Sequence, residues 1–85
     1  MKKLVKEIEG LLIMYKALRD SDELLNSEYF DSMSYDIDGY EEAVFEAEDS
    51  NDIDELEDIK KNLKNQVEAF TKMVIAMKQV KFIYG

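Results

Sequence analysis

Hydrophobic residues recur along this chain at spacings of three and four, the period of one face of an α-helix. In residues 3–19 the recurring positions are Leu4, Ile8, Leu11, Tyr15 and Leu18, widened by Val5, Leu12 and Met14, while Ile13 lies further round. A helix is therefore predicted over residues 3–19.

The last third of the chain carries the clearest helical pattern. Its apolar positions are Leu56, Ile59, Leu63, Val67, Phe70, Val74 and Met77. Asp52 and Glu55 have capping-box spacing, and lysines near the other end suit the helix dipole. The pattern predicts a helix from about residue 52 to 82, about 45 Å long at a rise of ~1.5 Å per residue.

The middle of the chain is less regular. A short helix over residues 23–33, started by Asp20 and Glu23, would bury Leu24, Leu25, Tyr29 and Met33. A second helix from residue 38 or 39 to 49 would start with Asp38 as its cap. The alternative is a strand near residues 33–38, where apolar and polar residues alternate, paired with residues 80–84.

These elements predict an all-α fold. Proline is absent and there are only 3 glycines, so little interrupts the helices. We expect a single helical domain over residues 1–85, a small helical bundle of three to four helices. The long C-terminal helix would pack antiparallel to the earlier helices, which would lie end to end along it. A chain of 85 residues is near the size at which one core becomes marginal.

Charge divides the chain into three segments. Residues 20–58 contain 17 Asp and Glu residues and no Lys or Arg. The segments on either side are basic, with net charges of +3 and +5, and the whole chain has a net charge of −9. Such segregation governs partner choice and association rate more than it governs the fold.

Several functional classes lack their usual residues. Without Cys or His, the chain has no thiolate ligand, no imidazole ligand and no histidine base. A calcium-loop alignment around Gly39 fails, because Phe45 stands where the bidentate glutamate belongs. No apolar run is long enough to span a membrane, and no export signal is visible. We expect a cytoplasmic protein that is not an enzyme and has no cofactor or metal.

The strongest candidate for a binding surface surrounds Phe45. On a helix, its neighbours three and four residues away are all acidic, which would place an aromatic anchor inside a charged rim. With the acids at the start of the last helix, the candidate partner-binding residues are Glu41, Glu42, Phe45, Glu46, Glu48, Asp49, Asp54, Glu57 and Asp58. Alternatively, Phe45 packs on another segment, and the acids are only solvated or neutralise Lys2, Lys3 and Lys6.

The charge pattern favours a small acidic inhibitor or regulator that binds a basic groove of a larger, nucleic-acid-binding protein. Direct binding to nucleic acid or to a membrane is not expected. Size, charge and helical content resemble those of the small acidic proteins that phages and mobile elements use against host defences, including anti-CRISPR proteins and other DNA mimics. This resemblance lies in composition and carries no residue assignments.

The alternative is a helical homo-oligomeric interaction module. It would use the apolar side of the long helix, including Phe70, Met73, Met77, Val80, Phe82 and Ile83. Residues 80–84 contain many large apolar groups, so we expect them to be buried in this chain or against a copy of it. A homodimer is compatible with both hypotheses.

Overall fold

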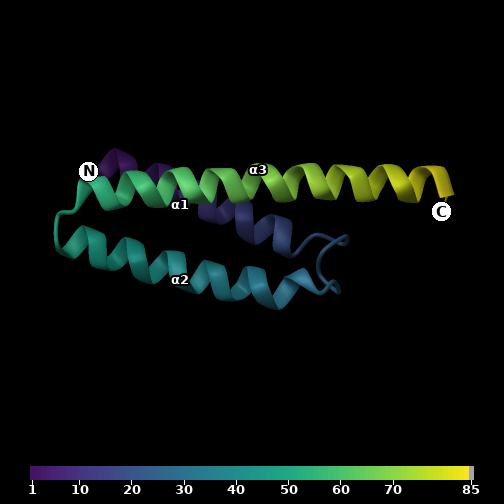
Figure 1. Ribbon diagram of the computed structural model, residues 1–85, viewed down its shortest axis with the longest axis horizontal. Helices are drawn as coiled ribbons and strands as arrows, with labels where there is room; N and C mark the ends of the chain where they lie inside the picture. The colour runs from purple at the N-terminus through teal and green to yellow at the C-terminus, as the bar shows by residue number, and fades with distance from the viewer. Residues whose placement is uncertain (85) are drawn as a thin grey trace.

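The computed structural model describes the backbone of residues 1–84 and the side chains of residues 1–83. Three helices account for most of this range: α1 (Lys2–Arg19), α2 (Tyr29–Asp49) and α3 (Ile53–Tyr84). They form an elongated bundle (Figure 1) with principal extents of 50 × 20 × 14 Å. The prediction of a small all-α bundle is confirmed, with three helices and no strand among residues 1–84.

The helix directions differ in part from the prediction. Glu7 pairs with Lys60, and further along both helices the ring of Tyr15 lies 5.7 Å from that of Phe70, so α1 runs parallel to α3. The ring of Tyr29, at the start of α2, also contacts Phe70, so α2 is antiparallel to α3 as expected. The prediction that α3 is antiparallel to all earlier helices was wrong for α1.

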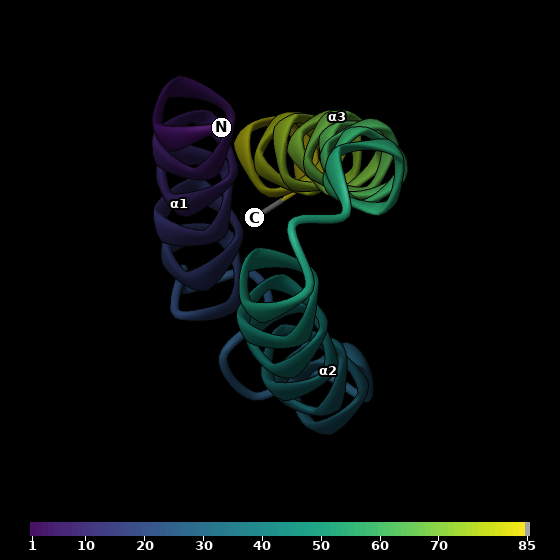
Figure 2. The ribbon, with the colours of Figure 1, turned by 90° about the vertical axis from the view of Figure 1, so that its left-hand side faces the viewer.

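The reason is the length of α2. With 21 residues it runs back along the whole of α1, which has 18, so these two helices lie side by side rather than end to end (Figures 1 and 2). Two reversals of direction, at residues 20–28 and 50–52, then return α3 to the direction of α1.

One long helix replaces the two short helices that were predicted for the middle of the chain. Residues 21–28 form turns, and α2 then continues through Asp38 and Gly39 without a break. The cap expected at Asp38 was therefore wrong, and so was the alternative of a strand near residues 33–38. A continuous apolar face holds α2 together, at Met33, Ile37, Tyr40, Val44 and Ala47.

Local hydrogen bonds define the turn between α2 and α3. The backbone N–H of Glu55 donates to Oδ1 of Asp52 over 3.0 Å, which confirms the predicted cap at the start of α3. Asn51 has a φ of 54°, in the left-handed region that asparagine tolerates better than most residues. The next N–H, of Asp52, donates to the carbonyl of Ala47 over 2.9 Å and closes the end of α2.

The core forms where all three helices meet. Its fully buried side chains are Ile8, Tyr15, Leu24, Met33, Ile37, Leu56 and Leu63. Tyr15 contacts the ring of Phe70 on α3 and, at 6.5 Å, the ring of Tyr40 on α2. Its hydroxyl donates to Oδ2 of Asp36 over 3.4 Å, so no polar atom of this buried side chain lacks a partner.

The far end of α3 has no neighbour within the bundle (Figure 1). At ~1.5 Å per residue α3 is about 48 Å long, against about 27 Å for α1 and about 32 Å for α2. Residues 80–84 were expected to be buried either in this chain or against a copy of it. The first alternative was wrong for residues 80–83, and Phe82 is 93% exposed. The side chain of Tyr84 lies outside the described residues. No helix among the described residues is long and apolar enough to cross a membrane.

We predict that Leu63→Ala destabilises the protein severely. The side chain is fully buried, and removing a buried leucine costs about 2–5 kcal/mol. The whole stability of a domain of this size is about 4–13 kcal/mol. Urea denaturation followed by circular dichroism measures the loss. Ile13→Ala, at a 68% exposed position, is the control, and equal losses from both variants would contradict this core.

We also predict that stability falls above about pH 10, the ordinary pKa of tyrosine. Burial and the Asp36 carboxylate raise the pKa of both Tyr15 and Tyr40 above that value. Above pH 10 the unfolded chain therefore releases protons that the folded protein retains, and the free energy of unfolding declines. Urea denaturation between about pH 9 and about pH 11 tests this. Tyr15→Phe should flatten the decline, whereas Tyr35→Phe, at an exposed position, should leave it unchanged.

Candidate acidic interface

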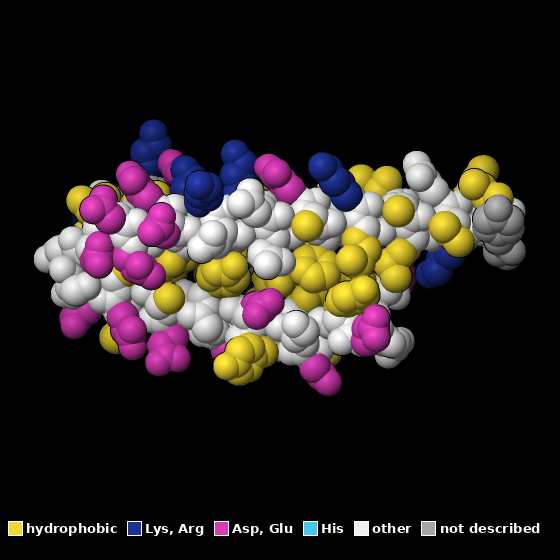
Figure 3. Space-filling model, in the orientation of Figure 1, with side chains coloured by type: hydrophobic (Ala, Val, Ile, Leu, Met, Phe, Trp, Pro, Cys, Tyr) yellow, Lys and Arg dark blue, Asp and Glu magenta, His cyan; other side chains and the backbone are white. Residues whose placement is uncertain are grey.

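Carboxylates gather at the end of the molecule where α2 ends and α3 begins (Figure 3). The tight turn at residues 50–52 joins the acidic second half of α2 to the acidic first turns of α3. All nine candidate partner-binding residues are exposed: Glu41, Glu42, Phe45, Glu46, Glu48, Asp49, Asp54, Glu57 and Asp58. A partner that approaches this end would meet them without any rearrangement of the core.

Phe45 is a solvent-exposed aromatic side chain within this acidic group. It is 73% exposed, so the alternative in which it packs on another segment of the chain was wrong. Because α2 is a regular helix here, the acids three and four residues away surround it, as the sequence predicted. A large apolar group in water has unused surface that a partner could cover.

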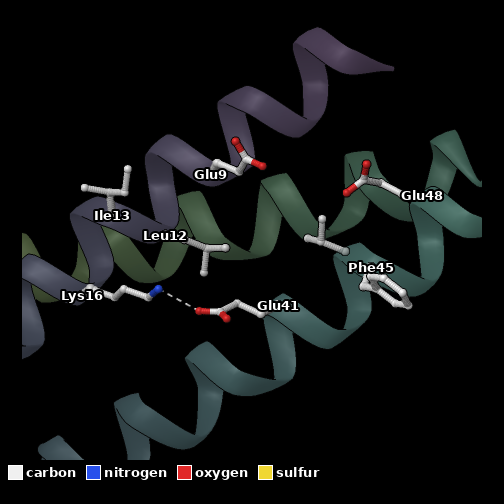
Figure 4. A pocket seen from close by; sticks show the side chains of 8 residues that line it. Glu9, Leu12, Ile13, Lys16, Glu41, Phe45 and Glu48 are labelled. Carbon is white, nitrogen blue, oxygen red and sulfur yellow. Dashed lines mark ion pairs between the residues drawn. The ribbon is translucent and has the colours of Figure 1, made fainter.

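A groove between α1 and α2, of about 470 Å³, borders Phe45. Its lining includes Glu9 and Ile13 from α1 and Glu48 from α2 (Figure 4). Nζ of Lys16 lies 2.8 Å from Oε1 of Glu41 across it. Neither Glu9 nor Glu48 is in an ion pair with any residue among 1–83, so both can accept a cation from a partner.

Sequence reasoning missed the contribution of α1 to this groove. Glu9, Ile13 and Lys16 follow helical spacing beside the buried stripe of α1, and this was the available signal. That signal does not say which helix lies opposite them. Because α1 and α2 pack antiparallel, Glu9 lies at the level of Glu48, and Lys16 lies at the level of Glu41.

The predicted surface divides between two sides of α2. Glu41, Phe45 and Glu48 lie toward α1, around the groove just described. Asp58 lies on the other side, in a second groove between α2 and α3 that also contains Glu55. A flat partner could contact only one of these sides fully, and each side presents an exposed aromatic side chain, Phe45 on one and Tyr35 on the other.

The lysines at the start of α1 form no ion pair with the acidic end in the described part of the chain. In the alternative interpretation the acids neutralise Lys2, Lys3 and Lys6, but no ion pair involves these lysines in the described part of the chain. They lie beside Glu7 on α1 itself, and Glu7 already pairs with Lys60 of α3. A hydrogen bond from Lys60, with the charges of Lys60 and Lys3, lowers the pKa of Glu7.

Few acids of residues 20–58 are paired as a result. Of the 17, only Asp20 and Glu41 are in an ion pair with a described residue. Most of the remaining carboxylates are exposed, and those in the second half of α2 and the first turns of α3 lie near one another, so their fields add. Among residues 1–83 no group of three or more acids is arranged to hold a metal ion.

Comparisons with known proteins identify no relative of this chain. No family model, no curated protein and no solved structure matches the chain.

We predict that Phe45→Ala leaves folding stability unchanged, within about 0.5 kcal/mol, because the side chain is mostly in water. The reference is Val44→Ala, one residue away, which removes a buried side chain and should cost about 1–3 kcal/mol. Thermal or urea denaturation of the two variants measures the difference. A loss of stability in Phe45→Ala as large as that in Val44→Ala would show that Phe45 packs in the core.

Proposed function

We propose that this protein is an inhibitor or regulator that binds a basic groove of a larger, nucleic-acid-binding protein through its acidic end. The observation that supports this most directly is the exposed, largely unpaired set of carboxylates around Phe45. A surface of one sign attracts a surface of the opposite sign and raises the rate of encounter.

The spacing of the charges supports imitation of a phosphate backbone. Carboxylates three or four residues apart on a helix lie about 5–6 Å from each other at their Cβ atoms. Duplex DNA carries one charge per ~1.7 Å of its axis, counted over two strands. Adjoining acidic turns of α2 and α3 approach such a row, so a groove built for phosphates would accept them. A DNA mimic of this kind would belong with the small acidic proteins of phages, including anti-CRISPR proteins.

Phe45 would supply affinity that charge alone does not. Exposed ion pairs contribute only about 0–1 kcal/mol each, and salt screens them. A central aromatic side chain that becomes buried inside a charged rim is the usual form of a strong contact. The exposed Phe45, with Ile13 across the groove, offers such a centre.

We predict that reversing three charges of the acidic end, in E42K/E46K/D49K, abolishes partner capture without loss of helicity. All three side chains are exposed, so the core is unaffected. The control D22K/E28K/D31K makes the same change in net charge at exposed positions near the opposite end. Immobilised protein is exposed to bacterial lysate, and the captured protein is then tested for competition with duplex DNA.

The expected result is capture by the wild type and the control but not by the reversed variant. Salt should release the captured protein, because raising it from about 0.1 M to about 1 M shortens the Debye length from ~10 to ~3 Å. Equal capture by the reversed variant, or a captured protein whose DNA binding is unaffected, would overturn the proposal.

A further inference from the structure

The end of α3 beyond the other helices carries a cluster of exposed apolar side chains. We call this segment, residues 75–83, the α3 tip. Ile75, Val80, Phe82 and Ile83 are all at least half exposed, and Phe82 is almost fully in water. Ile75, Phe82 and Ile83 lie together along one shallow groove of about 500 Å³. An exposed apolar cluster of this kind marks an interaction surface.

The α3 tip is also basic. Lys72, Lys78 and Lys81 lie on or next to it, and no acidic residue follows Glu68 in the sequence. Lys78 lines the same shallow groove as Phe82. The tip therefore combines apolar groups with positive charge, in a protein whose overall charge is −9.

The groove between α1 and α2 has the complementary character. It presents two exposed apolar side chains, Phe45 and Ile13, beside the unpaired carboxylates of Glu9 and Glu48. Its volume, about 470 Å³, can admit a few large side chains. Apolar groups would meet apolar groups, and lysines would meet carboxylates.

The two surfaces cannot meet within one molecule. The α3 tip projects past the turn that joins α1 to α2, whereas Phe45 and Glu48 lie in the second half of α2, toward the opposite end (Figure 1). α3 is one continuous helix from Ile53 to Tyr84, so it does not bend back. A tip that occupies this groove must belong to another molecule.

We propose that the α3 tip binds the groove between α1 and α2 of a second copy of this chain. Phe82 and its apolar neighbours cover Phe45 and Ile13, while Lys78 and Lys81 approach Glu9 and Glu48. Symmetric pairing of two tips is disfavoured, since it would bring Lys72, Lys78 and Lys81 of both copies together. The contact thus joins unlike surfaces, a tip and a groove, and each copy carries one of each.

This self-association goes beyond the proposed function and does not depend on it. It uses the isolated chain alone, so it can hold whether or not a basic partner exists. It does have a consequence for that partner: a copy seated on Phe45 and Glu48 occupies part of the acidic interface. Assembly and partner binding would therefore exclude each other at that side of α2.

Sedimentation of the purified protein over a range of concentrations is the first test. The mean mass should rise with concentration, and higher salt should weaken the rise because charge pairs contribute. Two variants remove one surface each: F82S changes the tip, and E9K/E48K reverses the groove. Both positions in the groove and Phe82 are exposed, so both variants should fold, which circular dichroism checks.

Mixing the two variants distinguishes contact between a tip and a groove from contact between two like surfaces. Each variant alone should associate at least about tenfold more weakly than the wild type. The mixture should form a dimer and stop there, since the intact tip of E9K/E48K fits the intact groove of F82S and no further surfaces remain. Tyr35→Ser, which removes another exposed aromatic side chain, should associate like the wild type.

Three results would overturn the proposal. One is a wild type that remains monomeric up to about 1 mM. Another is E9K/E48K associating as strongly as the wild type, which would indicate contact between tips. The third is a mixture of folded variants with no dimer. None of these outcomes bears on capture of a basic partner, so the proposed function stands or falls separately.

Discussion

Tyr15 on α1 contacts both other helices, and the positions of α2 and α3 relative to α1 depend on it. Its ring contacts Tyr40 on α2 and Phe70 on α3, and its hydroxyl donates to Asp36. A buried tyrosine needs a partner for its hydroxyl, so it tolerates few shifts of one helix along another. This contact sets α1 level with the middle of α2 and with the second half of α3. The groove beside Phe45 and the free length of α3 both follow from that register.

The same register separates the charges. The lysines at the start of α1 lie beside Glu7 on the same helix, and parallel packing brings Glu7 to Lys60 on α3. The acidic half of α2 thereby keeps few cationic neighbours, with Lys16 at Glu41 as the ion pair that crosses from α1. Acidic and basic residues that are clustered in the sequence thus lie on different faces and at different ends of the folded molecule. Both proposed interactions draw on this difference.

The sequence predicted what depends on helical period and failed where the answer depends on other segments. The limits of α1 and α3 and the cap at Asp52 were right, since local spacing and capping chemistry determine them. α2 was divided because Asp38 and Gly39 suggested a start, although Met33, Ile37 and Tyr40 already continue one apolar face. The direction of α1, the role of Glu9 and the exposure of Phe82 could not be predicted, because a period does not identify the opposing helix or its length. For the same reason the sequence did not decide whether Phe45 packs in the core, and its exposure in the structure shows that it does not.

The two reversals of direction also have a consequence for how the chain folds. α1 with α2, and α2 with α3, are hairpins whose contacts are comparatively close in sequence, whereas Glu7 and Lys60 on the parallel pair are 53 positions apart. Closing a long loop costs more entropy than closing a short one, so local hairpins form readily and distant contacts follow. α2 belongs to both hairpins and can serve as the template for either. The parallel contact between α1 and α3 would then be the last to form, completing the core around a helix that was already in place.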